Sequence, residues 1–362
     1  MKVKTLLILT ALLVVLIGAG VMVIRMNAPK APDAAMGAYL IRNLPVNEIE
    51  YITLEGPSDR VRLEKESGKW VVADRSGYPA DFSRIIDFVR ALREAKTGRR
   101  FEASPGTLAR LSLLDPSSEG PSDENKGTRV RFLDAGERIL ANLLLGSPRS
   151  SGSGAASGGR YVSIEGSSAV YLIDEPLSQY KPSPADWVKK ELLDIPASKI
   201  QSLACRKDSE YLYRFERDES GDPFEPVIFP SGEKVDEQVL KKLSEVPASF
   251  RIDDVLPVSQ IDQSAFNTCL EYRFFDGRIM LLCPLENDEA GPLVRISAGY
   301  DRPAADKKDS GLNVQIDEET AVETAELQDI VSRWVFKLSR WRFDSLITDP
   351  AELTADEKDP AS

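Results

Sequence analysis

The residue types that usually carry out catalysis are scarce in this chain of 362 residues, which contains no histidine. Without histidine there is no Ser-His or Cys-His nucleophile pair and no imidazole ligand for a metal ion. A hydrolase would have to use carboxylates or lysine alone, and we can place neither a carboxylate pair nor a Ser-Lys arrangement. We therefore predict no catalytic residue, no cofactor, no cofactor-binding residue and no metal ligand, and we expect that the chain is not an enzyme.

The cysteines could in principle support a disulfide or a metal site. The chain has three of them: Cys205, Cys269 and Cys283. None lies in a C-x-x-C arrangement, which argues against a zinc site and against a thioredoxin-like redox pair. Asp276-Gly277 predicts a two-residue hairpin loop, which sets Phe274 opposite Ile279 and leaves one face uniformly apolar. A three-residue loop would set the two later cysteines opposite each other and pair Phe274 with Arg278. The apolar pattern favours the first register and predicts no disulfide.

Two further groups resemble ligand-binding motifs only in their composition. The first is a set of glycines: Gly152, Gly154, Gly158 and Gly159. Neither a Lys-Ser/Thr pair nor a helix follows them, as a phosphate-binding loop requires, so we interpret them as part of a connecting loop. The second consists of two acidic clusters, Asp253-Asp254 and Glu286-Asp288-Glu289, which lack the ligand spacing and fixed glycine of a calcium loop. We interpret them as solvated charge.

Two pairs of residues could also suggest a site. Asp81 and Asp236 occupy equivalent positions, but each is explained as the N-cap of a helix in its own module, which would place them far apart. Trp334 and Trp341 flank a strand-like segment from Val331 to Phe343 and could form a platform for a sugar. Aromatic residues at strand spacing belong more often to a core or an interface, and we adopt that interpretation.

The elements that must position any site begin with an unbroken apolar run near the start of the sequence. Residues 6–24 contain Thr10 as their only polar side chain. At about 1.5 Å per residue they reach about 28 Å, close to the hydrocarbon thickness of a bilayer. Lys2 and Lys4 precede the run and favour a cytoplasmic N-terminus. We predict a transmembrane anchor at residues 1–25, which contacts the bilayer through residues 6–24, and a spacer at residues 26–38.

A cleaved signal peptide is the alternative interpretation of this run. Gly18-Ala19-Gly20 resembles a small-residue cleavage site, but it lies inside the run rather than after it. The run is also longer than the apolar core of a signal peptide, which has about 7–15 residues, so an anchor is preferred. The formal net charge of −12 argues against a nucleic-acid partner and against anionic headgroups, because an acidic surface repels both.

An internal repeat follows the spacer. Residues 44–49 are echoed by residues 195–200, and each copy leads through strand-like alternation to a helix that begins at an aspartate. Farther along, Arg131-Phe132-Leu133-Asp134 is matched by Arg273-Phe274-Phe275-Asp276. We predict an α+β fold with two tandem duplicated modules of mainly antiparallel sheet and packed helices, at residues 39–196 and 197–347. Residues 348–362 are acidic and contain proline, and we predict a disordered tail there.

Two helices and one loop are specified locally. The first helix is expected to begin after Asp81 and to end before Gly98, with an apolar stripe that faces the sheet. The members of that stripe are Phe82, Ile85, Ile86, Val89 and Leu92. Ser183-Pro184-Ala185-Asp186 predicts a second helix, which would carry Trp187, Leu192 and Leu193. The Ser- and Gly-rich segment at residues 147–159 is interpreted as a hairpin connection, because strand-like sequences flank it.

Several segments after the apolar run occur in an order that is typical of one family. They are Gly68-Lys69-Trp70-Val71-Val72, Tyr78-Pro79-Ala80-Asp81, Leu113-Leu114-Asp115-Pro116, Gly159-Arg160-Tyr161-Val162, Val170-Tyr171-Leu172-Ile173 and Asp186-Trp187-Val188-Lys189-Lys190-Glu191-Leu192-Leu193. From about Gly37 to Leu346 the chain resembles domain-of-unknown-function family 4340. That family is similar to the extracytoplasmic part of the auxiliary component of gliding-motility-type ABC transport systems. The resemblance implies an accessory protein beside an ABC-type permease and its ATPase, both supplied in trans, and carries over no catalytic residue.

We therefore expect a membrane-anchored extracytoplasmic accessory or scaffold protein that is associated with an ABC-type transport system. We expect it to be a single-pass protein of the bacterial inner membrane, with a cytoplasmic N-terminus and periplasmic C-terminal domains. The alternative is a periplasmic solute- or glycan-binding receptor with a cleft between the two modules, because duplicated domains commonly place ligands at their interface.

Overall fold

The computed structural model describes residues 36–41, 43–149, 158–167, 169–300 and 318–355. The predicted anchor lies outside these ranges, as do most of the predicted spacer and much of the loop at residues 147–159. Within the described part of the chain, no helix is long and apolar enough to cross a membrane. The described residues form α+β structure with mainly antiparallel sheets and few helices, which confirms that part of the predicted fold class.

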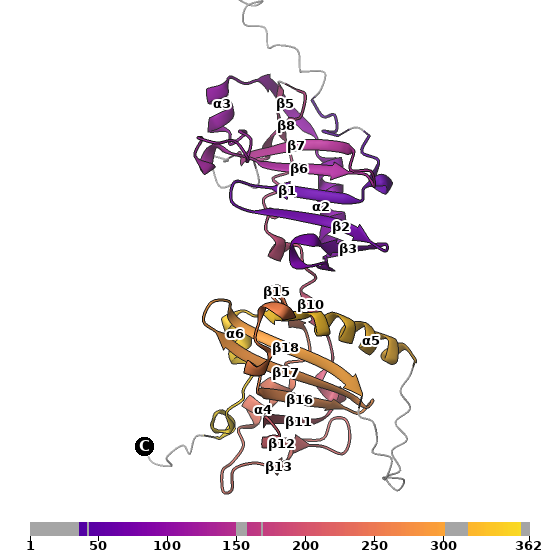
Figure 1. Cartoon of the computed structure of the whole chain (residues 1–362), viewed down its shortest axis with the longest axis vertical. Coiled ribbons are helices and arrows are strands. Elements are labelled where there is room, and N and C mark those ends of the chain that lie inside the picture. The colour runs from indigo at the N-terminus through magenta and orange to yellow at the C-terminus, as the bar shows by residue number, and fades with distance from the viewer. Residues whose placement is uncertain (1–35, 42, 150–157, 168, 301–317, 356–362) are drawn as a thin grey trace, which may run out of the picture. The chain divides into compact units, whose positions relative to one another are not determined.

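One sheet has nine strands in the order β4-β3-β2-β1-β6-β7-β8-β9-β5 (Figure 1). Its strands are β1 (Tyr51–Glu55), β2 (Arg60–Glu66), β3 (Lys69–Val72), β4 (Tyr78–Pro79), β5 (Thr97–Glu102), β6 (Thr128–Leu133), β7 (Ile139–Pro148), β8 (Arg160–Ile164) and β9 (Ala169–Ile173). Alternate residues are buried, such as Ile52 and Leu54 in β1, as expected when one face of a sheet packs on a core. Helix α2 (Phe82–Glu94) packs on this sheet, because the rings of Phe88 and Phe132 lie 6.1 Å apart.

A second sheet has eight strands in the order β13-β12-β11-β16-β17-β18-β19-β15, and all its pairings are antiparallel. Its strands are β11 (Ile200–Lys207), β12 (Glu210–Glu216), β13 (Glu225–Ile228), β15 (Asp254–Pro257), β16 (Thr268–Phe274), β17 (Arg278–Asn287), β18 (Gly291–Tyr300) and β19 (Trp334–Lys337). Helix α4 (Glu237–Ser244) packs on one face, where the buried Tyr272 hydroxyl donates a hydrogen bond of 3.0 Å to the carbonyl of Leu243.

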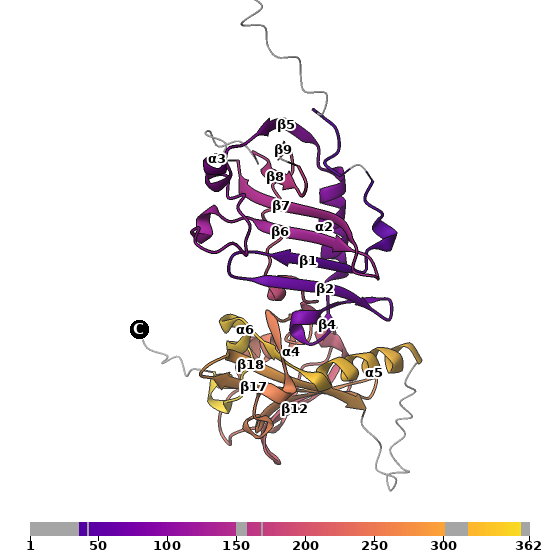
Figure 2. The same ribbon diagram turned by 45° about the horizontal axis from the view of Figure 1, so that its top comes forward.

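The remaining elements are short, except for α5. A two-stranded sheet pairs β10 (Glu191–Leu193) with β14 (Phe250–Arg251). Helix α5 (Glu318–Arg333) packs along β18, as Figure 2 shows, and it also contacts β19. The other helices are α3 (Pro105–Arg110) and α6 (Arg340–Asp344). The 3₁₀ turns are η1 (Val46–Glu48), η2 (Ala73–Arg75), η3 (Asp123–Asn125), η4 (Pro184–Asp186), η5 (Ala197–Lys199), η6 (Val258–Gln260), η7 (Gln263–Ala265) and η8 (Pro350–Leu353).

Contacts group the chain into two compact units. The first consists of residues 1–46, 89–130 and 141–178. The second consists of residues 47–88, 131–140 and 179–362, and it holds the whole eight-stranded sheet together with β1 to β4. The candidate site described below lies entirely within the second unit.

The two large sheets have the same strand order. If β4 is set aside, β3-β2-β1-β6-β7-β8-β9-β5 corresponds strand by strand to β13-β12-β11-β16-β17-β18-β19-β15. In chain order, the 3₁₀ turn η1 comes just before β1, and the 3₁₀ turn η5 comes just before β11, the equivalent strand of the other sheet. The β6–β7 and β16–β17 hairpins also begin alike, because the carboxylates of Asp134 and Asp276 accept hydrogen bonds from Arg138 and Arg278. The landmarks that suggested a sequence repeat therefore occupy equivalent places in the two sheets.

The register predicted for the β16–β17 hairpin is wrong by one residue. Tyr272 lies opposite Met280, and Cys269 is joined to Cys283 by a disulfide with a Cα–Cα distance of 4.1 Å. The loop has three residues and ends in the left-handed Gly277. Pairing of Phe274 with Arg278 was the reason for rejecting this register. The guanidinium is accommodated because the Asp276 carboxylate binds it and because it lies 5.5 Å from the centroid of the Phe274 ring.

The helix predicted at Ser183 does not form. Only the 3₁₀ turn η4 occurs there, and the chain then becomes extended. The amide of Lys189 donates to the carbonyl of Pro79 at 2.9 Å, and Val188 forms an antiparallel bridge with Ala80. Bridging to β4 and pairing with β14 give backbone partners to Trp187, Lys189 and Lys190, so these tertiary contacts override a local helix signal.

The first helix agrees with its prediction only in part. Asp81 caps it as expected, because its carboxylate accepts a hydrogen bond of 3.0 Å from the amide of Arg84. The helix ends at Glu94, and Gly98 belongs to β5 rather than to a C-terminal cap. The buried stripe is centred on Phe88, so that Phe82 and Ile86 are exposed. Helical spacing alone did not specify which side of the helix faces the sheet.

The predicted disordered tail is ordered at its beginning. Residues 350–353 form η8, and Leu353 is fully buried. The carbonyl of Leu353 accepts a hydrogen bond of 2.8 Å from the amide of Asp236, the residue that caps α4. The acidic composition suggested disorder, but one leucine and its backbone dock this segment on α4. Residues 356–362 lie outside the described ranges.

We expect the chain to contain one disulfide and one unreactive thiol. Burial raises the pKa of the Cys205 thiol to about 12, so this group stays protonated and enclosed in the folded protein near pH 8. Maleimide labelling followed by intact-mass measurement should give no adduct on the folded protein, one in denaturant and three in denaturant after reduction. Cys205→Ser should remove the single adduct. Three adducts without reduction would contradict the disulfide.

Leu353→Ala is expected to lower the free energy of unfolding by about 2–5 kcal/mol, the usual cost of truncating a fully buried leucine. Chemical denaturation of the purified protein measures the change. Glu352→Ala alters the exposed neighbouring residue and should change the stability by less than about 0.5 kcal/mol. Equal and negligible effects of both substitutions would mean that this segment does not dock.

Candidate functional site

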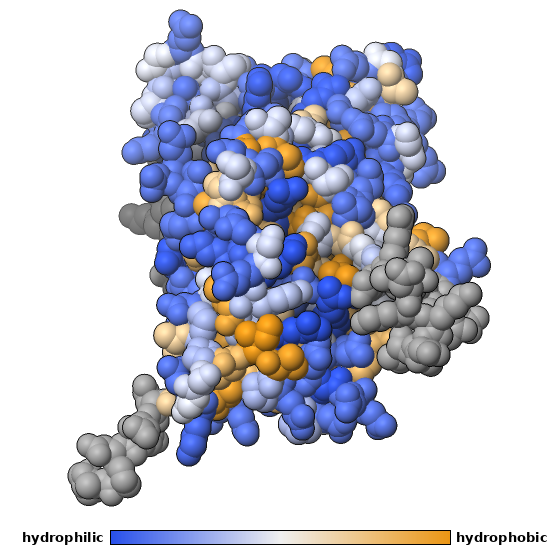
Figure 3. Space-filling model, turned by 60° about the horizontal axis from the view of Figure 1, so that its bottom comes forward, coloured by the Kyte–Doolittle hydropathy of each residue, from blue (hydrophilic) through white to orange (hydrophobic). Residues whose placement is uncertain are grey.

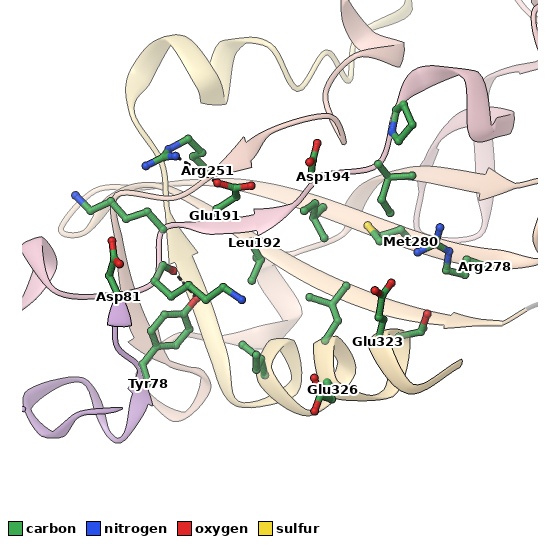
Figure 4. Close-up of a pocket in the computed structure, with 18 of the residues that line it drawn as sticks. Tyr78, Asp81, Glu191, Leu192, Asp194, Arg251, Arg278, Met280, Glu323 and Glu326 are labelled. Carbon is green, nitrogen blue, oxygen red and sulfur yellow. Dashed lines mark hydrogen bonds and ion pairs between the residues drawn. The ribbon is translucent and has the colours of Figure 1, made fainter. Parts of the chain in front are cut away.

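The second unit contains a cavity of about 710 Å³ (Figure 4). Four stretches of chain line it: the end of β4 with the start of α2, the extended segment from Lys189 to Pro196, the start of β17, and helix α5. These stretches belong to different elements that lie far apart in the sequence. The cavity therefore depends on contacts that fasten β4 and the extended segment to the eight-stranded sheet.

Tyr78 provides the central contact. Its ring is buried and packs edge-on against Trp334 at 5.2 Å between centroids, with Phe336 at 6.3 Å. Its hydroxyl donates a hydrogen bond of 3.1 Å to the carbonyl of Lys189. Burial raises the pKa of the Tyr78 phenol, so the hydroxyl remains a donor across the ordinary pH range. One side chain thus ties β4 to β19 and to the wall of the cavity.

An ion pair reinforces this attachment. The Arg75 guanidinium binds both carboxylate oxygens of Asp254, with Nε–Oδ1 and Nη2–Oδ2 distances of 2.7 Å. The indole nitrogen of Trp334 donates to the carbonyl of Arg75 at 2.9 Å. The hydrogen bond to Asp254 raises the pKa of Arg75. Asp254 is the first residue of β15, which is the last strand in the order of its sheet, so the pair also occupies a sheet edge.

The charges that line the cavity are balanced in sign, and several are paired within the chain. Glu191 pairs with Arg251 at 3.6 Å, and Glu326 pairs with Lys69 at 3.6 Å. The buried Arg278 is held by the carboxylate of Asp276. Figure 4 shows Glu323 of α5 on the side of the cavity where Arg278 and Met280 of β17 lie.

The hydroxyl groups of the lining do not form a nucleophilic arrangement with these charges. Thr324 uses its hydroxyl to donate to the carbonyl of Thr320 at 2.8 Å. The carboxylate nearest in sequence to Ser83 belongs to Asp81, which accepts the amide of Arg84 as a helix cap. Within the described ranges, no group of three His, Cys, Asp or Glu residues could hold a metal ion. The geometry of the cavity suits the binding of a ligand by charged groups and backbone.

The acidic, glycine and tryptophan residues that were considered as ligand-binding candidates in the sequence do not come together in the structure. Asp254 binds Arg75 and Glu286 binds Arg340, so these carboxylates serve ion pairs. Gly159 adopts a left-handed conformation, and a side chain there would collide with the carbonyl of Ile173. Gly152 and Gly154 lie outside the described residues. Trp334 belongs to the core, as predicted, whereas Trp341 is exposed on α6 rather than on a strand.

The lining residues were not identified as a site from the sequence. Tyr78, Asp81 and the segment from Lys189 to Leu193 were noticed only as landmarks of a family. More than one hundred residues separate the two stretches, and the second was expected to be helical. The only local signal was the density of lysine, glutamate and leucine around Glu191, which an ordinary exposed helix would share.

We expect Arg75→Ala to destabilise the protein by about 2 kcal/mol, because each partner of this ion pair is less than one-third exposed and both hydrogen bonds involve charged groups. Asp254→Ala should cost a similar amount, and the double substitution little more than either alone. Denaturant unfolding measures these values. The exposed pair of Arg340 and Glu286 is the control, for which Arg340→Ala should cost less than about 1 kcal/mol. Additive losses at Arg75 and Asp254 would contradict the coupling.

Comparison with protein families gives a match. A family model matches residues 70–268, which is more than half of the chain. This range contains β4, the start of α2, the extended segment and β14, and stops before β17 and α5. No curated protein and no solved structure matches the chain. The match confirms the family expected from the sequence, and the chain belongs to the family described as a domain of unknown function (DUF4340).

Proposed function

We propose that this chain is a membrane-anchored extracytoplasmic accessory protein that acts by binding an integral membrane partner, such as the permease of an ABC-type transport system. The observation that carries the proposal is the disulfide between Cys269 and Cys283, because disulfides persist mainly in oxidising compartments. The apolar run at residues 6–24 supports it, since the run has the length of a membrane span. The protein would be a single-pass protein of the bacterial inner membrane, with its N-terminus in the cytoplasm and residues 39–347 in the periplasm.

The periplasmic part would consist of two copies of one α+β module. The matching strand order of the two sheets supports this duplication, as do the equivalent hairpins that begin at Asp134 and Asp276. We assign the copies to residues 39–196 and 197–347.

Apolar patches on the surface support the binding of a protein partner. The face shown in Figure 3 is mainly hydrophilic and carries separate apolar patches. Exposed apolar side chains include Phe82 on α2, Val227 on β13, Val322 on α5 and Trp341 on α6. Aromatic side chains such as those of Phe82 and Trp341 are enriched in protein interfaces.

Chemical crosslinking in intact membranes, followed by mass spectrometry, tests this proposal on the full chain. We expect crosslinks to one integral membrane protein. Val15→Arg places a charge within the apolar run at a cost of about 2.5–3.5 kcal/mol on the insertion scale and should impair anchoring and lower the crosslink yield. Val15→Leu is the matched control and should change neither. Absence of any integral membrane partner, with the wild-type protein anchored, would overturn the proposal.

A periplasmic solute- or glycan-binding receptor is the second candidate. The cavity favours it, because its volume lies in the range of small-molecule sites and both charge signs line it. A thermal-shift screen of soluble metabolites and glycans against the purified chain separates the two functions. A ligand that raises the melting temperature in a saturable manner would favour the receptor, because only binding to the folded state stabilises it.

A further inference from the structure

One wall of the cavity is a strand with an open edge. The amide of Ile252 donates to the carbonyl of Lys190 at 2.9 Å, while Glu191 lies opposite Arg251. In an antiparallel pair this pattern makes Glu191 a non-hydrogen-bonded position relative to β14, so its amide and carbonyl point away from β14. The two-stranded sheet contains only β10 and β14, so β10 has no strand on its other side among the described residues.

The open edge begins where β4 stops. Asp81 donates its amide to the carbonyl of Trp187 at 2.8 Å, and Lys189 donates to Pro79, so β4 occupies this edge as far as Lys189. The chain before Tyr78 then leaves the line of the strand through the left-handed Gly77. Backbone groups alternate along a strand, so those of Glu191 face the same side as those of Lys189. A further strand placed there would continue the line that β4 begins.

The opposite wall supplies side-chain contacts for such a strand. Leu327 and Ile330 of α5 are partly buried and line the cavity, as does Leu192 of β10. Figure 4 shows α5 across the cavity from the extended segment. An extended peptide alternates its side chains, so that every second one can contact an apolar wall while its backbone bonds to a strand edge.

The geometry points to this cavity as a docking groove for an extended peptide segment of the partner protein, added as a strand along β10 beside Glu191. The segment carries apolar side chains at alternate positions, which contact Leu327 and Ile330. A peptide fits the groove because the backbone edge beside Glu191 has no partner among the described residues, whereas Glu191, Glu326 and Arg278 of the lining are paired within the chain. This inference rests on the proposed function and names how the partner is held.

Site-specific photo-crosslinking on the full chain in native membranes tests it. A benzophenone-bearing residue at Glu323, which lines the cavity, should crosslink to one segment of the membrane partner. The same residue at Ala325, exposed two positions along α5 and turned to the opposite side of the helix, should not. Peptide mapping of the crosslinked product identifies the segment and its pattern of alternate apolar residues.

The amide of Glu191 has no partner in the described part of the chain, and it gives the decisive variants. Glu191→Pro removes this amide without removing a bond to β14, and proline is tolerated at a strand edge. It should lower the crosslinking yield at Glu323 by about tenfold, as expected for one lost backbone hydrogen bond. Glu191→Ala keeps the amide and should stay within about twofold of the wild type. Ile330→Asp alters the opposite wall and should also lower the crosslinking yield at Glu323. This variant replaces Glu191→Pro as the test if the proline variant does not fold.

The outcomes separate this inference from the proposed function. If general crosslinking captures the membrane partner but the probe at Glu323 does not, the groove is wrong and the proposed function stands. If the probe captures a lipid, a small solute or a second copy of this chain, the peptide groove is also wrong. Equal yields from Glu191→Pro and the wild type would contradict strand addition. Capture of no partner by either method would overturn the proposed function itself.

Discussion

The burial of Tyr78 is the contact on which the rest of the second unit depends. A buried phenol must find a hydrogen-bond partner, and here that partner is the carbonyl of Lys189 rather than a group nearby in the sequence. The same ring packs against Trp334 and Phe336 of β19. Three stretches that lie far apart in the chain are thereby fixed to one another, and the wall of the cavity is one of them.

The ion pair of Arg75 with Asp254 fixes the orientation of the segments that the packing of Tyr78 brings together. A bidentate pair constrains the approach of two groups more tightly than packing does, because two parallel hydrogen bonds fix an orientation. Asp254 begins an edge strand, and an edge strand that is covered is less available for unwanted pairing. The pair therefore contributes to specificity as well as to stability.

One wall of the cavity is formed by a helix that has no equivalent at the same place in the first sheet. In the nine-stranded sheet only four residues separate β8 from β9. The corresponding connection, from β18 to β19, contains α5, which forms one wall of the cavity. Two sheets with the same strand order thus acquire different surfaces through a single insertion. Loops and insertions commonly carry the function that a shared framework positions.

The sequence by itself determined the features that depend on neighbouring residues. The alternation of apolar residues predicted antiparallel sheets, Asp81 and Asp236 were identified as helix caps, and the family followed from the order of short motifs. The anchor at residues 6–24 remains a prediction from the sequence. These features follow from the pattern of apolar residues and from local hydrogen bonding, which a linear sequence displays.

Only the tertiary structure decided the features that depend on distant partners. The register of the β16–β17 hairpin depends on the position of Arg278 beside Phe274. This position is tolerated because the Asp276 carboxylate binds the guanidinium. The segment after Pro184 became extended because β4 and β14 offered it backbone partners, and Leu353 was buried because α4 offered it a surface. The cavity arises from such contacts alone. Its residues carry no shared local signal, since the energy that assembles them comes from packing between remote parts of the chain.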